Sequence, residues 1–417
     1  MAKPTNIATT LVAGLMGLAL IAPATANECP IDARKSQAVG QSVGKKVQTA
    51  FTQYSEEDTA GALETLLEIN ARDEFDNAYV SRFIGNLYAE QGNIPTAIKY
   101  MKIAVDSDML GGPDHAASLK LYADLMMMEK QFDTAIPTYR AWMDFTCKED
   151  ADVYTRIGVA LSETKKYDEV IPVADKAIAL TKAAGEDPKK GPYQLKLTSY
   201  YNTKKYNESI DVLETMIPLF IDDKRLWVQL AQFYLLVEDY KKALATYDIA
   251  YLSGYLETDG NVRRLSQLLS QNGSHYRAAK IWEKHMNEGL IPTNEKNLRD
   301  LAGFYQRAKE HVTAAKYYGK AAAINNDGEL YLKEGILLAQ AERYKEAKPI
   351  FDKALKAGID NPGEAHIQLM LAHLSLKEIK SAYKNAKLAA KDKKTKRHAD
   401  NYISFIEEKA RLYGVTL

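Results

Sequence analysis

The residue types that could carry chemistry in this chain are seven histidines, two cysteines and one glycine-rich segment. His366 and His373 lie seven residues apart, which places them on the same face of a helix. A metal site would need further ligands with their own hydrogen-bond partners, so we interpret both histidines as packing residues. Residues 40–46 (GQSVGKK) resemble a phosphate loop, but they have one spacer too few and end in lysine rather than serine or threonine. The sequence therefore predicts no enzyme, no cofactor and no metal site.

The N-terminus predicts export. Residues 11–22 (LVAGLMGLALIA) form an apolar run too short for a membrane-spanning helix, and residues 24–26 (ATA) supply a small-residue cleavage pattern. We predict a signal peptide over residues 1–26 that is cleaved after Ala26, with an uncleaved anchor as the alternative. The mature chain is then expected in the periplasm, without insertion into the membrane.

Cys29 and Cys147 remain after cleavage. Export permits a disulfide, but the sequence does not supply the Cα separation that decides pairing. One bridge and two unpaired thiols both stay open. Glu28, directly before Cys29, argues against lipidation of that cysteine.

Charge and composition exclude some classes of function. The 417 residues include 55 Lys and Arg against 55 Asp and Glu, and this zero net charge argues against general nucleic-acid binding. The balance is uneven along the chain, because residues 27–220 carry 30 acidic and 22 basic residues and residues 221–417 carry 25 and 32. We expect an acidic end and a basic end. The 26 tyrosines far outnumber the 10 phenylalanines.

An internal repeat organises the chain. Its clearest copy has Trp227, Leu230, Ala231 and Tyr234 on a first helix and Ala243 on a second, with the spacing of a tetratricopeptide repeat. The equivalent second-helix position recurs at residues 62, 97, 135, 170, 209, 243, 278, 314, 347 and 382. We predict an all-α fold, a right-handed superhelical solenoid of about ten helix-turn-helix repeats over residues 27–392. A capping helix is expected over residues 393–417, and a longer first helix with a leading turn over residues 28–54.

The repeat pattern assigns a role to each residue type. Small residues let the two helices of a pair approach closely, and large residues fill the space between repeats. Tyrosine suits these sites because its ring packs while its hydroxyl reaches the wet edge of the repeat. This accounts for the tyrosine surplus without a binding site.

The concave groove is the predicted binding surface, because first-helix positions 2, 5, 9, 12 and 13 face the groove and bind peptides in the proteins that this chain resembles. Carried onto this chain, those positions are Tyr79, Arg82, Asn86, Lys120, Asp124, Gln194, Tyr201, Arg225, Gln232, Arg263, Gln267, Arg299, Gln306 and Arg307. The carboxylate clamp of chaperone-binding repeats is broken by Leu121 and Asp152. The arginine series Arg225, Arg263 and Arg299 favours an acidic segment as ligand, since guanidinium groups bind carboxylates with two hydrogen bonds.

Four segments extend the resemblance beyond the generic repeat. They are VGKKVQTAF (43–51), RFIGNLYAE (82–90), WMDFTCKEDADVYTRI (142–157) and FYLLVEDYKKALATYDIAYLSGYLE (233–257). They are similar to a group of exported bacterial repeat proteins associated with the TonB energy-transduction system, and the similarity covers the mature chain. The resemblance implies TonB, ExbB and ExbD components as partners and a scaffold role in outer-membrane uptake. A periplasmic chaperone or envelope-assembly factor unrelated to TonB is the alternative.

Overall fold

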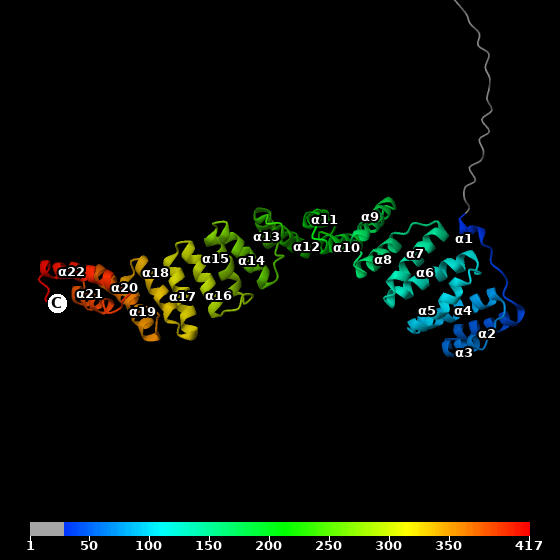
Figure 1. The fold of residues 1–417 in the computed structure, drawn as a ribbon, viewed down its shortest axis with the longest axis horizontal. Coiled ribbons are helices and arrows are strands. Elements are labelled where there is room, and N and C mark those ends of the chain that lie inside the picture. The colour runs from blue at the N-terminus through cyan, green and yellow to red at the C-terminus, as the bar shows by residue number, and fades with distance from the viewer. Residues whose placement is uncertain (1–28) are drawn as a thin grey trace, which may run out of the picture. The chain divides into compact units, whose positions relative to one another are not determined.

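The computed structural model describes residues 29–417, and within that range every regular element is an α-helix. Residues 1–28, which include the predicted signal peptide and its cleavage site, lie outside the described residues. Contacts between Cα atoms divide the chain into two compact units. Figure 1 colours the helices from blue at the N-terminus to red at the C-terminus. Unit 1 ends at Thr203 and unit 2 spans Lys204–Leu417.

Unit 1 consists of one short helix, four helix pairs and the first helix of the fifth repeat. Its helices are α1 (Pro30–Ala33), α2 (Gln41–Ser55), α3 (Thr59–Leu67), α4 (Glu74–Glu90), α5 (Ile94–Asp106), α6 (Gly112–Met128), α7 (Phe132–Thr146), α8 (Ala151–Glu163), α9 (Tyr167–Ala183) and α10 (Lys190–Asn202).

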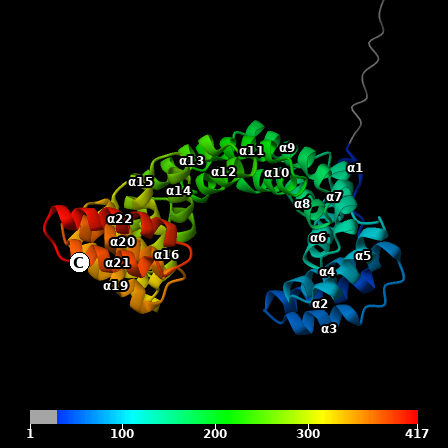
Figure 2. The same cartoon turned by 60° about the vertical axis from the view of Figure 1, so that its left-hand side comes forward.

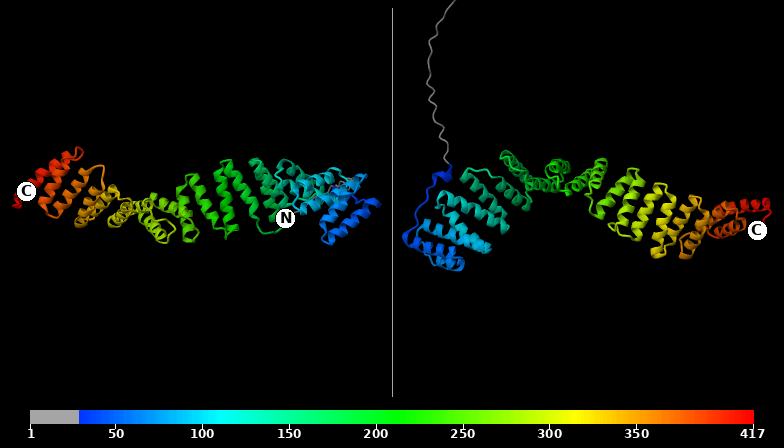
Figure 3. Two further views of the ribbon diagram at one scale, coloured as in Figure 1. Left: turned by 90° about the horizontal axis from the view of Figure 1, so that it is seen from below. Right: turned by 180° about the vertical axis from the view of Figure 1, so that it is seen from behind.

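Unit 2 begins with the second helix of the fifth repeat, continues with five helix pairs and ends in one further helix. Its helices are α11 (Tyr206–Leu219), α12 (Arg225–Leu236), α13 (Tyr240–Leu252), α14 (Asp259–Gln271), α15 (His275–Asn287), α16 (Glu295–Arg307), α17 (His311–Asn325), α18 (Gly328–Gln340), α19 (Tyr344–Ala357), α20 (Pro362–Ser375), α21 (Ile379–Ala389) and α22 (Lys396–Leu412). Figures 2 and 3 show the successive pairs from α14 onward packed side by side within this unit.

The predicted repeat frame is confirmed by burial. All ten predicted second-helix anchors have no exposed surface: Ala62, Ala97, Ala135, Val170, Ser209, Ala243, Ala278, Ala314, Ala347 and Ala382. For nine of the ten predicted repeats, both helices belong to the same unit. The exception is the fifth repeat, because the unit boundary falls between its two helices, α10 and α11. We call the first helix of each repeat its A helix and the second its B helix.

The turn inside each repeat places one residue in the left-handed region of backbone space. Glycine occupies this position at Gly92 and Gly273, with φ of 73° and 82°. Elsewhere a charged residue takes the same conformation: Glu57, Lys130, Lys165, Lys204, Glu238, Lys309, Glu342 and Lys377. The left-handed region is sterically unfavourable for residues other than glycine, because their Cβ atom crowds the backbone. The packing of the helices on either side therefore holds these turns in place.

The prediction of a longer first helix with a leading turn over residues 28–54 is only partly right. Only α1 and α2 are helical there, and residues 34–40 between them are not. We call residues 29–40 the N-terminal strap. Its backbone is bonded to later repeats: Gly112 N donates to Arg34 O at 3.1 Å, and Gly40 N donates to Asp76 Oδ1 at 2.8 Å. These contacts with α4 and α6 replace the intrahelical bonds that a longer helix would have made.

The strap explains two adjacent glycines at the start of α6, Gly111 and Gly112. A Cβ atom at Gly112 would lie 2.1 Å from Ile31 O, and one at Gly111 would lie 2.4 Å from Ser36 Oγ. The strap therefore passes so close to the start of α6 that only glycine fits at both positions.

The C-terminal helix caps the last repeat, as predicted. On α22, Ala399 and Ile406 are fully buried and pack with Ile367 of α20 and Ala386 of α21. The other face of α22 is exposed. A helix with one buried face and one exposed face can end a stack of repeats, because it leaves no apolar surface for another repeat to cover.

Among residues 29–417, no helix combines the length and the hydropathy that crossing a lipid bilayer requires.

Candidate protein-binding surface

The A-helix face of unit 1 is a ladder of ion pairs between neighbouring repeats. Arg82 on α4 pairs with Asp114 on α6 at 3.0 Å, and Asp124 on α6 pairs with Arg156 on α8 at 2.9 Å. Asp124 also accepts a hydrogen bond from the Tyr139 hydroxyl. Of the predicted groove residues, Arg82 and Asp124 therefore hold A helices together, and their charges are compensated within the chain.

Lys120 belongs to the same ladder. Its ammonium lies 3.8 Å from Asp150, at the start of α8, and 4.9 Å from the centre of the Trp142 ring. Tyr79 packs its ring against Phe75 on its own helix, with ring centroids 6.1 Å apart. These two predicted groove residues also act within the repeat stack.

The remaining predicted residues of unit 1 are more accessible. Asn86 on α4 is half-buried, whereas Gln194 and Tyr201 on α10 are exposed. Tyr201 leaves 53% of its surface accessible. The predicted groove residues of unit 1 thus include paired charges on α4 and α6 and exposed polar groups on α10.

The arginine series of unit 2 does not act as one set. Arg225 is the most exposed, with 82% of its side chain accessible, and it bonds to Asp223, two residues before α12 begins. Arg263 donates to Asn297 Oδ1 at 2.6 Å and lies 5.1 Å from the centre of the Trp282 ring. Arg263 thus joins α14 to α16 and packs on α15, which is a structural role.

Arg299 is different, because half of its side chain is accessible and its guanidinium lies 3.7 Å from Glu295, beyond hydrogen-bond distance. On the same helix, Arg307 donates to Ser270 Oγ at 3.2 Å. Among the residues that the structure describes, no carboxylate forms an ion pair with Arg307. Both arginines flank Gly303, since the three residues are spaced four apart along α16.

The Tyr318 hydroxyl, from α17, lies beside this glycine and donates to Gln306 at 3.0 Å. Burial raises the pKa of Tyr318, while the positive charges of Arg307 and Arg299 oppose that rise. Sequence reasoning named Arg299, Gln306 and Arg307 but missed Gly303 and Tyr318. The spacing of residues 299, 303 and 307 was a signal that could have indicated the glycine.

Gln232 on α12 and Gln267 on α14 are exposed on the same face of unit 2. The A-helix face of α12, α14 and α16 thus presents exposed glutamines together with two cationic groups that have spare hydrogen-bond donors. Unit 1 differs because Arg82 and Asp124 pair with residues of neighbouring repeats, whereas Arg299 lies near Glu295 of its own helix.

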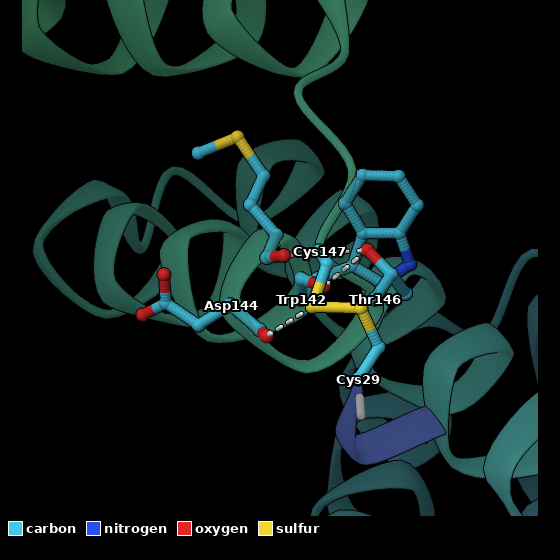
Figure 4. Close-up of a disulfide and its surroundings, with 6 residues drawn as sticks. Cys29, Trp142, Asp144, Thr146 and Cys147 are labelled. Atoms are coloured by element: carbon cyan, nitrogen blue, oxygen red, sulfur yellow. Dashed lines mark hydrogen bonds between the residues drawn. A yellow bond between two sulfur atoms is a disulfide. The ribbon is translucent and has the colours of Figure 1, made fainter. Parts of the chain in front are cut away.

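Cys29 and Cys147 form a disulfide with their Cα atoms 5.9 Å apart, which joins the strap to the end of α7 (Figure 4). Thr146, beside Cys147, donates its hydroxyl to Trp142 O at 2.7 Å. Arg34 of the strap pairs with Asp108 at 2.7 Å. The strap is therefore fixed both covalently and by an ion pair.

A pocket of about 520 Å³ opens beside the disulfide, among residues of α7, α8 and α9. One of its carboxylates, Glu149, pairs with Lys176 at 2.7 Å and accepts from the Tyr154 hydroxyl at 3.2 Å. These bonds compensate the charge of that carboxylate within the chain.

The two histidines considered for metal binding have separate partners. His366 Nδ1 lies 3.0 Å from Asn385 Oδ1, whereas His373 Nδ1 bonds to Glu378. Within residues 29–417, no group of three or more His, Cys, Asp or Glu residues is placed to hold a metal ion.

A family model described as tetratricopeptide repeat matches residues 84–146, from α4 to α7. The fold is a solenoid of tetratricopeptide repeats. Such repeats form extended surfaces that bind protein partners.

Three solved structures are similar to this chain. A tetratricopeptide repeat protein from Parabacteroides merdae has 15% identity over 64% of this chain and 100% of its own, with a TM-score of 0.36. The C-terminal part of a TPR repeat-containing protein from Cytophaga hutchinsonii has 17% identity over 60% and 98%, with a TM-score of 0.44. Naa15/Naa10 bound to HypK-THB has 12% identity over 84% and 58%, with a TM-score of 0.47. No curated protein sequence matches the chain.

Proposed function

We propose that this chain is an exported interaction scaffold that assists a TonB–ExbB–ExbD type system in outer-membrane uptake. In this proposal the A-helix face of unit 2 binds protein segments. The observation that carries the binding role is a contrast between the units. In unit 1, Arg82 and Asp124 form ion pairs between repeats. In unit 2, Arg299 and Arg307 have N–H groups that are available to hydrogen-bond a ligand.

Two observations support export. Residues 1–26 have the pattern of a signal peptide, and the disulfide between Cys29 and Cys147 suits an oxidising compartment. The TonB association rests on the family resemblance of the four segments described above. The absence of any recognised catalytic motif is consistent with a scaffold and with no enzyme activity.

The test is crosslinking in intact cells of the native host, followed by purification of the tagged full-length chain. Recovery of TonB, ExbB or ExbD components in crosslinks to unit 2 supports the proposal. Recovery of unfolded outer-membrane proteins without those components contradicts it and favours a chaperone. A chain that stays in the cytoplasm after fractionation contradicts the export step independently.

A further inference from the structure

The last repeat carries a row of lysines on its B helix. Lys380, Lys384 and Lys387 follow helical spacing on α21, on the side opposite the buried residues Ala382 and Ala386. The basic residues continue through the following turn into α22. We call the complete set the basic face, and all eight of its members are exposed: Lys380, Lys384, Lys387, Lys391, Lys393, Lys394, Lys396 and Arg397.

The charges of the basic face are not balanced by nearby acidic groups. Asp392 is the one acidic residue in residues 380–397, which leaves this segment with a net charge of +7. In the part of the chain that the structure describes, no carboxylate forms an ion pair with the basic face, whereas Lys348 on α19 pairs with Glu378 at 2.6 Å. Lysines one helical turn apart repel each other, so the fold by itself gains no stability from this row.

The first repeat carries the complementary charge. Residues 56–76, which include α3, contain eight acidic residues and one basic residue, a net charge of −7. On α3, Glu64 and Glu68 lie on the side opposite the buried Leu66. We call the exposed acidic residues of this segment the acidic face: Glu56, Glu57, Asp58, Glu64, Glu68, Asp73 and Glu74. Among them, only Glu68 forms an ion pair within residues 29–417, at 3.5 Å from Lys46.

Exposed apolar side chains accompany both faces. Leu67, on the same side of α3 as Glu64, leaves 46% of its surface accessible. On α22, whose first residues belong to the basic face, Phe405 and Leu412 leave 46% and 69% accessible. Complementary charges orient two surfaces and speed their encounter, while burial of apolar groups adds affinity. The helices of both faces therefore offer the two components of a protein interface.

We propose that the basic face of one copy of this chain binds the acidic face of a second copy. The two segments have opposite net charges of equal size, and a chain with no net charge meets no long-range repulsion from its own copies. An anionic membrane or an unrelated acidic partner would account for the basic face alone, whereas a second copy accounts for both faces. The contact is heterologous, so each bound copy still presents one face to a further copy. This association goes beyond the scaffold function and does not depend on it.

The test is sedimentation velocity of the purified full-length chain over a range of protein concentrations. We expect the average mass to rise with concentration at about 20 mM salt and to fall to that of the monomer at about 500 mM, because salt screens the charges. A chain that remains monomeric at low salt overturns the proposal. If that monomer instead binds vesicles containing phosphatidylglycerol through its basic face, a membrane surface is the occupant.

Two charge-reversal variants identify the surfaces. The first combines Lys380→Glu, Lys384→Glu and Lys387→Glu, and the second combines Glu56→Lys, Glu57→Lys and Glu64→Lys. Each variant alone should associate at least about tenfold more weakly, because like charges then meet at the contact. An equimolar mixture should associate again, since the intact acidic face of the first variant meets the intact basic face of the second. Misfolding cannot produce this rescue, and a mixture that stays monomeric overturns the proposal.

The matched control combines Lys241→Glu, Lys296→Glu and Lys345→Glu, three exposed lysines of unit 2 outside the basic face. It changes the net charge by the same amount as the first variant and should leave association unchanged. Equal weakening in this control would show that the attraction is nonspecific and would overturn the assignment. Weakening by reversal of only one of the two faces would also overturn it, because the proposed contact requires both.

Discussion

The Tyr305 hydroxyl donates to the Glu283 carboxylate at 2.6 Å, and this bond joins α16 to α15 of the preceding repeat. Tyr317 of α17 donates to the other oxygen of the same carboxylate, and its ring stacks on Tyr305 with centroids 5.8 Å apart. A similar bond links Tyr234 to Glu214. These three tyrosines thus fasten helices together, with the ring buried and the hydroxyl on a carboxylate.

Removing one such hydroxyl should destabilise unit 2. We expect Tyr305→Phe to lower the free energy of unfolding by about 1.5–3 kcal/mol, the usual contribution of a hydrogen bond to a charged group. Urea unfolding followed by circular dichroism measures the change. Tyr276→Phe is the control: its exposed ring contacts Tyr305, but its hydroxyl makes no hydrogen bond within residues 29–417, so a change below about 0.5 kcal/mol is expected.

Glu334 should make unit 2 less stable as the pH rises. Burial raises the pKa of this carboxyl to about 7, and the positive charge of Lys353 only partly opposes the effect. A folded-state pKa above the unfolded value favours folding at low pH, and this contribution is lost as the pH rises toward 7. Glu334→Gln should therefore gain stability relative to the original chain between pH 4.5 and pH 8.

Glu283→Gln is the matched comparison, because its carboxyl has the opposite shift. Burial alone would raise the pKa of Glu283, but hydrogen bonds from Tyr305, Tyr317 and Lys280 lower it to about 2. The stability that this group contributes is present above the unfolded pKa and is lost as the pH falls toward 2. Thermal unfolding midpoints from pH 3 to pH 8 measure both effects, and parallel pH profiles for the two variants would contradict them.

Glycine in a strained turn should stabilise the chain. Lys309 has a φ of 62° at the turn position where the previous repeat has Gly273, with a φ of 82°. We expect Lys309→Gly to raise the free energy of unfolding by about 0.5–1 kcal/mol, because relief of the steric cost exceeds the added entropy of the unfolded chain. Gly273→Ala should lower it by a similar amount. Chemical denaturation of both variants provides the measurement, and a destabilised Lys309→Gly would show that the turn is not strained.

Reducing the disulfide should loosen unit 1. The bridge joins residues 118 apart, and closing a loop of that size stabilises a protein by up to about 5 kcal/mol. We expect Cys29→Ser to increase hydrogen exchange in the strap and α6, and to allow trypsin to cut after Arg34 and Lys35. Exchange in α14–α19 of unit 2 is the internal control. Equal protection of the strap with and without the bridge would show that the Arg34–Asp108 pair suffices.

The repeat frame was readable from the sequence because it depends on local spacing. A small residue recurs about every 35 positions wherever two helices must touch, and each of those positions is buried in the structure. The final capping helix was predictable for the same reason, since its apolar residues follow helical spacing. Tyrosine was correctly interpreted as a packing residue with a polar tip.

The candidate site could be predicted only in part. Arg225, Arg263 and Arg299 look alike in the sequence, yet Arg263 is bonded to Asn297 and only Arg299 lies in the cluster around Gly303. Which guanidinium keeps spare donors depends on the side chains of neighbouring repeats, and no spacing rule records those contacts.

The sequence by itself determined the all-α repeat, its register and the residues that separate helix from helix, because each of these follows from periodic burial within some 35 residues. Tertiary structure decided the rest. Pairing of Cys29 with Cys147 and the path of the strap over Gly111 and Gly112 both depend on how distant segments meet in three dimensions. Contacts between residues far apart in the chain leave no periodic signal, so the fold had to be seen before they could be named.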